Sequence, residues 1–221
     1  MKFIQENTNV PIPRLLDAWS DGEGTHMLMQ WIEGDTLQNR WHDLSKEDKM
    51  NIATQIRGFV DQLRALERPP AEASRIGPVD GSKLWDENVH VEPQGPFSDE
   101  EEFNQFMLSR LDWFIQSPSA ASSQNLAIIK DRTRNDHRIV FTHSDLHSRN
   151  ILINENADVV GILDWGMSAW MPDYWEFVTC VNGSPLISDW EDYASIFTHE
   201  DRTQLEVSDA YIAIHNAPFW T

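Results

Sequence analysis

Two short apolar segments joined by a polar turn limit most strongly how this chain can fold. Residues 151–153 and 159–163 have the length and composition of buried strands, and the polar residues 154–158 between them suit a turn. Apolar residues at helical spacing occur over residues 45–66, 98–114, 174–181 and 200–215. The order therefore predicts an α+β fold in which a β-hairpin is embedded among helices, rather than a doubly wound sheet.

A second hairpin is expected near the start of the chain. Residues 14–19 and 26–32 read as strands, separated by the turn-forming sequence Asp-Gly-Glu-Gly at residues 21–24. The first eight residues resemble the end of a helix, and Pro11 and Pro13 enforce extended backbone after it. This hairpin leads through a Glu-Gly-Asp hinge into the helical part of the chain.

The embedded hairpin is flanked by polar residues that suit a magnesium site. His143, Asp145 and Asn150 lie before its first strand, and Asp164 follows its second strand. Because a hairpin brings its two ends together, the side chains of Asn150 and Asp164 can face one point. Two oxygen ligands at one point suit Mg²⁺, which keeps several waters and takes further ligands from phosphates. Asp145 can then orient a hydroxyl group toward a phosphate bound to that metal.

These residues resemble the active-site motifs of the aminoglycoside phosphotransferase family, also called the choline-kinase-like group. His143, Asp145 and Asn150 match the family pattern His-x-Asp-x-x-x-x-Asn, and Asp164 followed by Trp165 matches its metal-binding aspartate. The resemblance covers most of the chain in the expected order. It implies a protein-kinase-like α+β fold and transfer of the γ-phosphate of ATP, with Mg²⁺, to a hydroxyl of a small molecule.

The resemblance also implies a role for each matching residue. Asp145 and His143 are the expected catalytic residues, with His143 holding the loop in shape rather than touching substrate. Asn150 and Asp164 are the expected metal ligands. Glu176 ends an aromatic-rich acidic segment and is expected to brace the catalytic loop.

A hinge strand for the nucleotide is implied further upstream. Gln30, Trp31 and Ile32 match the segment whose backbone would bond to adenine, although core packing explains the two apolar residues nearly as well. The family plan divides the chain into residues 1–34, a remnant of an N-terminal lobe with its hinge, and residues 35–221, a C-terminal helical lobe that holds the catalytic loop.

Several parts of the family's nucleotide site have no match in the sequence. No Gly-x-Gly-x-x-Gly occurs, and Lys2 is the only lysine before the first hairpin. We therefore expect an N-terminally truncated enzyme with weak or no kinase activity by itself. We also expect the hairpin of residues 14–32 to have an open edge and an uncovered face.

Composition restricts the partners. With 17 Lys and Arg against 36 Asp and Glu, the net charge is −19, which argues against a nucleic-acid partner. The acidity serves solubility in one interpretation and attracts a cationic substrate in another. No apolar run is long enough for a membrane span, and Cys180 is the only cysteine. A cytoplasmic protein is expected, and the sequence leaves its oligomeric state open.

Three features near the loop have weaker interpretations. His147 and Arg149 are expected to face solvent or to serve the loop structure, and Arg149 could approach a phosphate. Gly166 stands where the family often carries an acidic residue. The irregular, Pro- and Gly-rich residues 69–96 are expected to shape or cover the site, but they do not reveal the acceptor.

Two other functions are compatible with the sequence. The chain could be a non-catalytic, pseudokinase-like binding module, since the expected ATP-binding parts are incomplete. It could also be a metallohydrolase that uses His143, Asp145 and His147 as zinc ligands. The hydrolase hypothesis leaves the hairpin and Asp164 without a purpose. Metal analysis of purified protein would test it, because tightly bound stoichiometric zinc would favour a hydrolase over a phosphotransferase.

Overall fold

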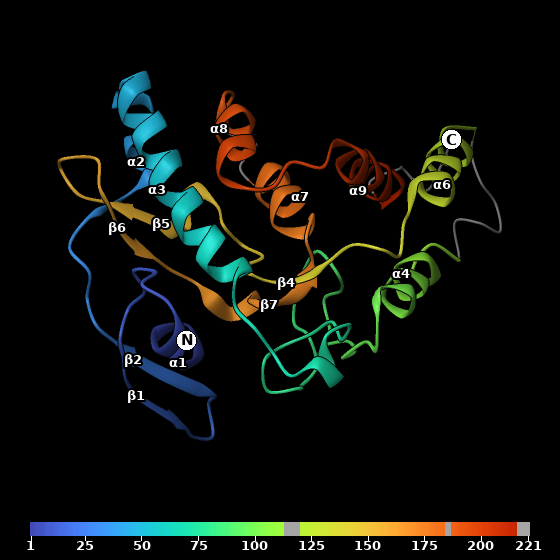
Figure 1. Ribbon diagram of the computed structural model, residues 1–221, viewed down its shortest axis with the longest axis horizontal. Helices are drawn as coiled ribbons and strands as arrows, with labels where there is room; N and C mark the ends of the chain where they lie inside the picture. Colours follow the sequence, from blue (N-terminus) through green and yellow to red (C-terminus); the bar gives the residue numbers. More distant parts are fainter. Residues whose placement is uncertain (113–119, 184–186, 216–221) are drawn as a thin grey trace.

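The computed structural model describes residues 1–112, 120–183 and 187–215 (Figure 1). The α-helices are α1 (Lys2–Asn7), α2 (Leu37–Arg40), α3 (Lys46–Arg64), α4 (Glu100–Ser109), α6 (Ala120–Arg132), α7 (Trp175–Asn182), α8 (Trp190–Phe197) and α9 (Arg202–His215). The strands are β1 (Leu15–Ser20), β2 (Thr25–Met29), β3 (Asp35–Thr36), β4 (Ile139–Thr142), β5 (Ile151–Ile153), β6 (Val159–Ile162) and β7 (Ala169–Pro172). Single 3-10 turns are η1 (Trp41–Asp43), η2 (Pro70–Glu72), η3 (Ser148–Asn150) and η4 (Trp165–Met167). The predicted α+β fold is confirmed.

Three small antiparallel sheets organise the described chain. β1 pairs with β2, β5 lies between β3 and β6, and β4 pairs with β7. Both predicted hairpins are present, and the turn at Asp21 closes as expected. The sequence analysis missed β3 and β7. β3 has two residues, and β7 is fixed by its pairing with the distant β4.

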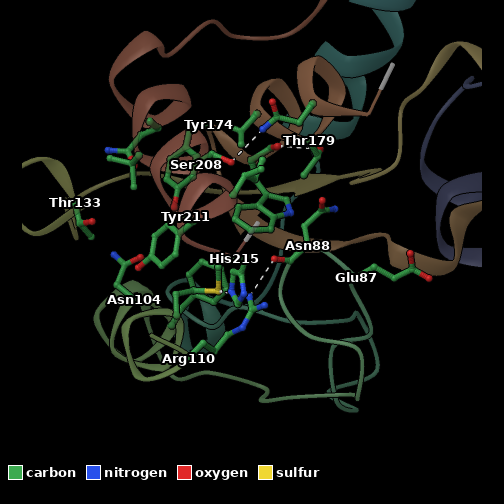
Figure 2. A pocket seen from close by; sticks show the side chains of 18 residues that line it. Glu87, Asn88, Asn104, Arg110, Thr133, Tyr174, Thr179, Ser208, Tyr211 and His215 are labelled. Atoms are coloured by element: carbon green, nitrogen blue, oxygen red, sulfur yellow. Dashed lines mark hydrogen bonds between the residues drawn. The ribbon is translucent and has the colours of Figure 1, made fainter. Parts of the chain in front are cut away.

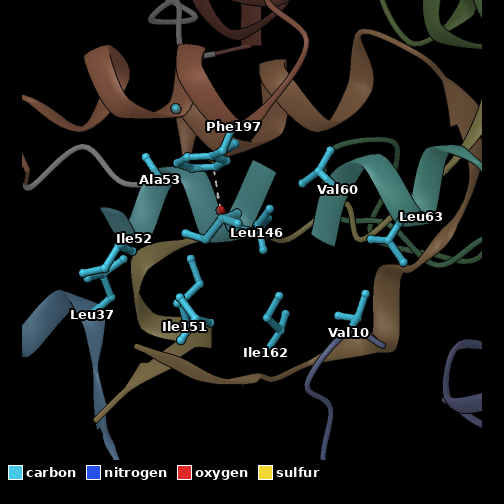
Figure 3. Packing of buried hydrophobic residues seen from close by; sticks show 14 of the residues in the cluster. Val10, Leu37, Ile52, Ala53, Val60, Leu63, Leu146, Ile151, Ile162 and Phe197 are labelled. Atoms are coloured by element: carbon cyan, nitrogen blue, oxygen red, sulfur yellow. Dashed lines mark hydrogen bonds between the residues drawn. The ribbon is translucent and has the colours of Figure 1, made fainter. Parts of the chain in front are cut away.

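Helix α3 is the central helix of the core. Its N-terminus is closed by a capping box, in which Ser45 and Asp48 exchange hydrogen bonds between side chain and backbone. Its buried face packs against α8, β4 and β6. Figure 3 shows that Leu146, within the polar loop of residues 143–150, and Ile151, directly after it, face this helix. These two apolar side chains therefore anchor the loop in the core.

Helix α4 begins close to the start of the predicted helical segment of residues 98–114. Asp99 is the N-cap, and its carboxylate accepts the backbone N–H of Glu102. The Glu102 carboxylate in turn accepts the N–H and hydroxyl of Ser98, at 2.6 Å and 2.7 Å. The C-terminal end of this predicted helix reaches residues 113–119, which lie outside the described chain.

The hairpin of β1 and β2 lies beside α1 at one end of the molecule (Figure 1). Five large apolar side chains of this hairpin are more than two-fifths exposed: Leu16, Trp19, Met27, Leu28 and Met29. Both of its edges are unpaired in the described sheet, as expected from the sequence. None of the described helices is both long and apolar enough to cross a bilayer.

Gly58 offers a test of how α3 contributes to stability. It lies on the exposed side of the helix, and a Cβ atom there would have no atom within 4 Å. We expect Gly58→Ala to raise the free energy of unfolding by about 0.5–1 kcal/mol, because alanine loses less backbone freedom on folding. Urea unfolding followed by circular dichroism measures this, and a lower free energy of unfolding would contradict the packing described for α3.

Candidate active site

The polar loop of residues 143–150 runs from β4 to β5 and is held by a buried carboxylate. Glu176, in the first turn of α7, accepts the backbone N–H of His143 at 2.6 Å and that of Ser144 at 3.1 Å. Ser144 has a positive φ of 66°, so its N–H and that of His143 point to the same acceptor. The structure therefore places Glu176 where the sequence expects a brace for the loop.

Burial raises the pKa of Glu176 to about 7, although its two N–H donors and the charge of Arg64 act in the opposite direction. The ordinary value, which applies to the unfolded chain, is 4.5. Between these values the unfolded chain has released a proton that the folded chain still holds. Raising the pH through this window therefore lowers the free energy of unfolding.

Replacing Glu176 by glutamine tests this assignment, because glutamine keeps the shape of the side chain and does not titrate. We expect wild-type protein to lose roughly 3 kcal/mol of stability between about pH 4.5 and about pH 7 from this group, a loss that Glu176→Gln lacks. Urea unfolding of both proteins at several pH values measures the difference in slope. Equal slopes would show that Glu176 is not the titrating group.

His143 is completely buried and links the loop to the far end of the hairpin. Its Nε2 atom lies 2.8 Å from the carbonyl oxygen of Leu163, and its Nδ1 atom is 3.2 Å from the backbone nitrogen of Asp145. This network assigns the proton to Nε2, with Nδ1 as acceptor. Burial lowers the pKa of His143 to about 4, so the ring is neutral near pH 7. These contacts support the expectation that His143 holds the loop in shape, and its burial leaves no exposed surface for a substrate to touch.

The Asp145 carboxylate is surrounded by three side chains from its own loop. Its Oδ2 atom accepts the amide N–H of Asn150 at 2.7 Å. Its Oδ1 atom lies 2.8 Å from Nδ1 of His147 and 2.9 Å from Nη2 of Arg149. Burial acts to raise the pKa of Asp145, but these partners outweigh it and lower the pKa below its ordinary value.

The surroundings of Asp145 revise the expectations for its neighbours. His147 is buried rather than solvent-facing, and its ring lies against the carboxylate. The guanidinium group of Arg149 is half-exposed, yet it also contacts this carboxylate. Both residues therefore belong to the arrangement around Asp145, which the sequence pattern alone did not indicate.

Asn150 and Asp164 lie at the two ends of the embedded hairpin. The backbone N–H of Leu163 donates to the Asn150 carbonyl at 2.8 Å, so the residue just before Asp164 pairs with Asn150 across the base of the hairpin. The amide nitrogen of Asn150 donates to the carbonyl and carboxylate of Asp145, so its side-chain oxygen remains available. Asp164 is exposed, and within the described chain its carboxylate has no hydrogen-bond or ion-pair partner.

This donor set fits a hard dication. One free carboxylate and one amide oxygen provide the two protein ligands that Mg²⁺ takes when phosphates and waters complete its shell. The backbone of Asp164 has φ 60° and ψ 69°, a left-handed conformation that costs a non-glycine residue roughly 1–2 kcal/mol. Such strain is typical of functional positions and here aims the carboxylate out of the fold.

The described residues do not form the alternative zinc site. The ring nitrogens of His143 are directed to Leu163 and to the backbone of Asp145, and those of His147 to Asp145 and Thr179. Across residues 1–112, 120–183 and 187–215, no three His, Cys, Asp or Glu side chains are grouped as metal ligands. The geometry therefore gives no support to a metallohydrolase.

The irregular residues 69–96 place an aromatic side chain beside the metal-site candidate. A Cβ atom on Gly166 would lie 3.4 Å from Oδ1 of Asp164 and 3.6 Å from the ring of Trp85. The half-exposed Trp85 ring and the Asp164 carboxylate thus both border Gly166, at distances that are ordinary van der Waals contacts for a Cβ atom. Neither Trp85 nor its contact could be read from the sequence, because the insert has no regular pattern.

The same insert borders a cavity of about 250 Å³ (Figure 2). The figure shows Glu87 and Asn88 of the insert near one side, Ser208 and Tyr211 of α9 near the other, and Arg110 below them. Further polar lining residues are Asn104, Thr133, Thr179, Asn182, Gln204 and His215. One wall includes Trp175, whose indole N–H donates to the buried Asp86 at 2.9 Å.

The expected hinge residues Gln30, Trp31 and Ile32 lie outside strand β2, whereas the sequence predicted a strand over residues 26–32. Strand β2 ends at Met29, and residues 30–34 continue as an extended segment outside the sheet. Trp31 is 79% exposed, so core packing within the described chain does not explain it. Ile32 does pack, against Gly161 of β6, and Gln30 donates its backbone N–H to Arg14.

Comparison with known proteins places these features in a family. A family model described as "APH: Phosphotransferase enzyme family" matches residues 1–206. A curated relative, "Clavilactone A biosynthesis cluster protein Y" of Ampulloclitocybe clavipes, is 24% identical over 197 residues. That match covers 78% of this chain and 48% of the relative, so the chain spans about half the length of the relative.

Solved structures share the fold. The GDP complex of an aminoglycoside 2'-phosphotransferase-IIIa variant has a TM-score of 0.62 at 14% identity, covering 97% of this chain and 68% of the other. The streptomycin–ATP ternary complex of APH(2'')-IIa has a TM-score of 0.57 at 15% identity, covering 97% and 70%. These likenesses confirm the predicted protein-kinase-like architecture.

Proposed function

The chain belongs to the phosphotransferase enzyme family, and we propose that it transfers the γ-phosphate of ATP to a hydroxyl group of a small molecule. The observation that supports this proposal is the arrangement of three residues around the base of the embedded hairpin. Asp145 and Asn150 are hydrogen-bonded on a loop that Glu176 braces, and Asp164 directly follows Leu163, which pairs with Asn150 across the hairpin.

In this proposal Asp145 binds and orients the acceptor hydroxyl. Its low pKa makes it a weak base, which suits phosphoryl transfer because the hydroxyl proton is released late in a loose transition state. The contacts from His147, Arg149 and Asn150 fix the carboxylate while it accepts that proton. Preorganisation of this kind is a large part of enzymatic rate enhancement.

Asn150 and Asp164 would hold the metal ion. When bound, Mg²⁺ neutralises charge on the phosphates and supports their in-line displacement. The Asp145–Asn150 hydrogen bonds leave the amide oxygen of Asn150 free, and the strained backbone of Asp164 keeps its carboxylate exposed. His143 connects these residues through Leu163 and thereby couples the base to the metal ligands.

The proposed nucleotide site and the expected turnover both depend on the N-terminal part of the chain. We propose adenine binding along residues 30–32, supported by the exposed Trp31 next to β2, and by related structures that hold ATP or GDP. Turnover by this chain should fall well below the roughly 1–100 s⁻¹ of kinases, since no glycine-rich loop or strand lysine grips the phosphates.

The cavity between the insert, α4, α7 and α9 is our candidate for the acceptor. Its side chains are a mixture of aromatic, amide and hydroxyl groups, with Glu87 as a carboxylate and Arg110 as a guanidinium. Burial lowers the pKa of Arg110 and also that of His215. A ring-containing acceptor of mixed polarity fits this lining, which carries one carboxylate, Glu87, that a cationic group on the acceptor could pair with.

A transfer assay with γ-labelled nucleotide tests the proposed function. Purified chain is incubated for hours with Mg²⁺, labelled ATP or GTP, and a panel of sugar, antibiotic, choline-like and amino-acid acceptors. We expect slow, Mg²⁺-dependent transfer of label to an acceptor. Nucleotide binding without transfer above the Asp145→Asn variant would instead favour the binding-module alternative.

A further inference from the structure

We infer that Gly183 is a positioning residue for Asp145. By lacking a side chain, it leaves the space in which the His147 ring lies against the Asp145 carboxylate. Gly183 follows α7 and lies 38 residues after Asp145 in the sequence, and no motif identifies it. This inference rests on the proposed function for its catalytic consequence, but its structural part can be tested without turnover.

The His147 ring lies between the loop and α7. Its Nδ1 atom is 2.8 Å from Oδ1 of Asp145, and its Nε2 atom is 3.1 Å from the carbonyl oxygen of Thr179. The same Thr179 carbonyl accepts the backbone N–H of Gly183 at 3.0 Å. The end of α7 therefore sets where the ring can lie, and the ring in turn lies against the carboxylate.

The space for this ring exists only because residue 183 is glycine. A Cβ atom there would lie 1.5 Å from Nε2 of His147, 2.0 Å from Cε1 and 2.3 Å from Cδ2. These distances are far inside van der Waals contact, so a single methyl group would displace the ring. The backbone at Gly183 has φ −89° and ψ −6°, which any residue can adopt. Space, and not backbone conformation, is thus what requires glycine.

A second contact reaches the same carboxylate from Gly183. Arg149 places Nη2 at 2.9 Å from Oδ1 of Asp145 and Nη1 at 3.5 Å from the carbonyl oxygen of Gly183. Two of the three side chains that contact the Asp145 carboxylate therefore also touch Gly183. Asn150, the third, is held by the loop itself. A substitution at Gly183 should disturb one side of the carboxylate and leave the side that faces Asn150 in place.

The kinetic test compares Gly183→Ala with Gly58→Ala, a matched glycine on α3 whose Cβ would meet open space. We expect Gly183→Ala to lower kcat by about 10–100-fold with KM for ATP changed less than about twofold, because misplacement of a catalytic group by about 1 Å is costly. Gly58→Ala should leave kcat unchanged. An unchanged kcat in Gly183→Ala would overturn the inference.

A double variant tests whether the effect passes through the ring. In the His147→Ala protein the space is empty, so adding Gly183→Ala should change kcat no further. Fully additive losses in the double variant would show that Gly183 acts by another route. If Gly183→Ala alone does not fold, the double variant should fold; failure of both to fold would contradict a clash with His147.

Nitrogen NMR of the imidazole rings separates this inference from the proposed function. In wild-type protein the His147 ring signals should shift when Asp145 is replaced by asparagine, and in Gly183→Ala this response should be lost. Gly58→Ala should keep it. If wild-type chain transfers no phosphate but shows this pattern, the proposed function fails and the positioning contact stands. If Gly183→Ala responds as wild type does, the contact itself is refuted.

Discussion

Asp145→Asn is expected to reduce phosphoryl transfer by about 10²–10⁴-fold while the chain remains folded. Asparagine has nearly the same shape, so the loop can keep its bracing contacts with Glu176. It loses the negative charge that faces His147 and Arg149 and that would accept the hydroxyl proton. Transfer of γ-labelled phosphate, with thermal unfolding as a check of the fold, measures the effect.

Asp189→Asn is the matched control for that substitution. Asp189 also pairs with a cation, Lys49 at 2.9 Å, and accepts an indole N–H, from Trp41 at 2.7 Å. It lies before α8, away from the loop of Asp145. Transfer should change less than about twofold in this control. Equal losses in the two variants would mean that Asp145 has no special part in the reaction.

Asp164→Ala is the second substitution with a large expected effect. Removing this carboxylate deletes one of the two protein ligands of the proposed metal site, so we expect Mg²⁺-dependent transfer to fall by at least about 10²–10³-fold. Raising the Mg²⁺ concentration should restore part of the activity. The transfer assay at several Mg²⁺ concentrations measures both effects.

Asp158→Ala provides the control within the same hairpin. Asp158 is an exposed aspartate in the turn between β5 and β6, with Asn154 as its side-chain partner at 3.1 Å. Its loss should weaken the turn without altering the Mg²⁺ requirement. If Asp158→Ala and Asp164→Ala showed the same Mg²⁺ dependence, the metal site would not be at Asp164.

The sequence predicted those features of the site that depend on contacts between residues close together in the chain. The spacing from Asn150 to Asp164 spans a hairpin, and local pairing of β5 with β6 is enough to bring the two ends together. The resemblance implies that Glu176 braces the loop, and in the structure its carboxylate accepts two backbone N–H groups of that loop. Apolar periodicity predicted the helix α3.

Other features depended on contacts between distant segments. β7 forms because β4, about 30 residues earlier, offers it a partner, and nothing within its own four residues requires a strand. The burial of His147 depends on the end of α7, and Trp85 reaches Gly166 from a distant insert that has no regular pattern. A glycine needed for space looks in sequence like any other glycine.

The division at residue 34 stays a prediction. The segment of residues 30–34 joins the β1–β2 hairpin to the remainder of the chain. Gly34 in this segment packs so closely on β5 that an added Cβ atom would lie 2.9 Å from the carbonyl oxygen of Ile153. Pro11 also accepts the N–H of Ile162 at 2.7 Å. These contacts connect the expected hinge to the hairpin that holds Asn150 and Asp164, as a nucleotide bridging the two parts would require.

Binding of Mn²⁺ in the presence of a non-hydrolysable ATP analogue can be followed by electron paramagnetic resonance. We expect a bound-metal signal in wild type, Asp145→Asn and Asp158→Ala that is lost in Asp164→Ala. This measurement needs no turnover, so weak activity does not obscure the result. Undiminished metal binding in Asp164→Ala, or its absence in wild type at saturating nucleotide, would contradict the assignment of this hairpin as the metal site of a phosphotransferase.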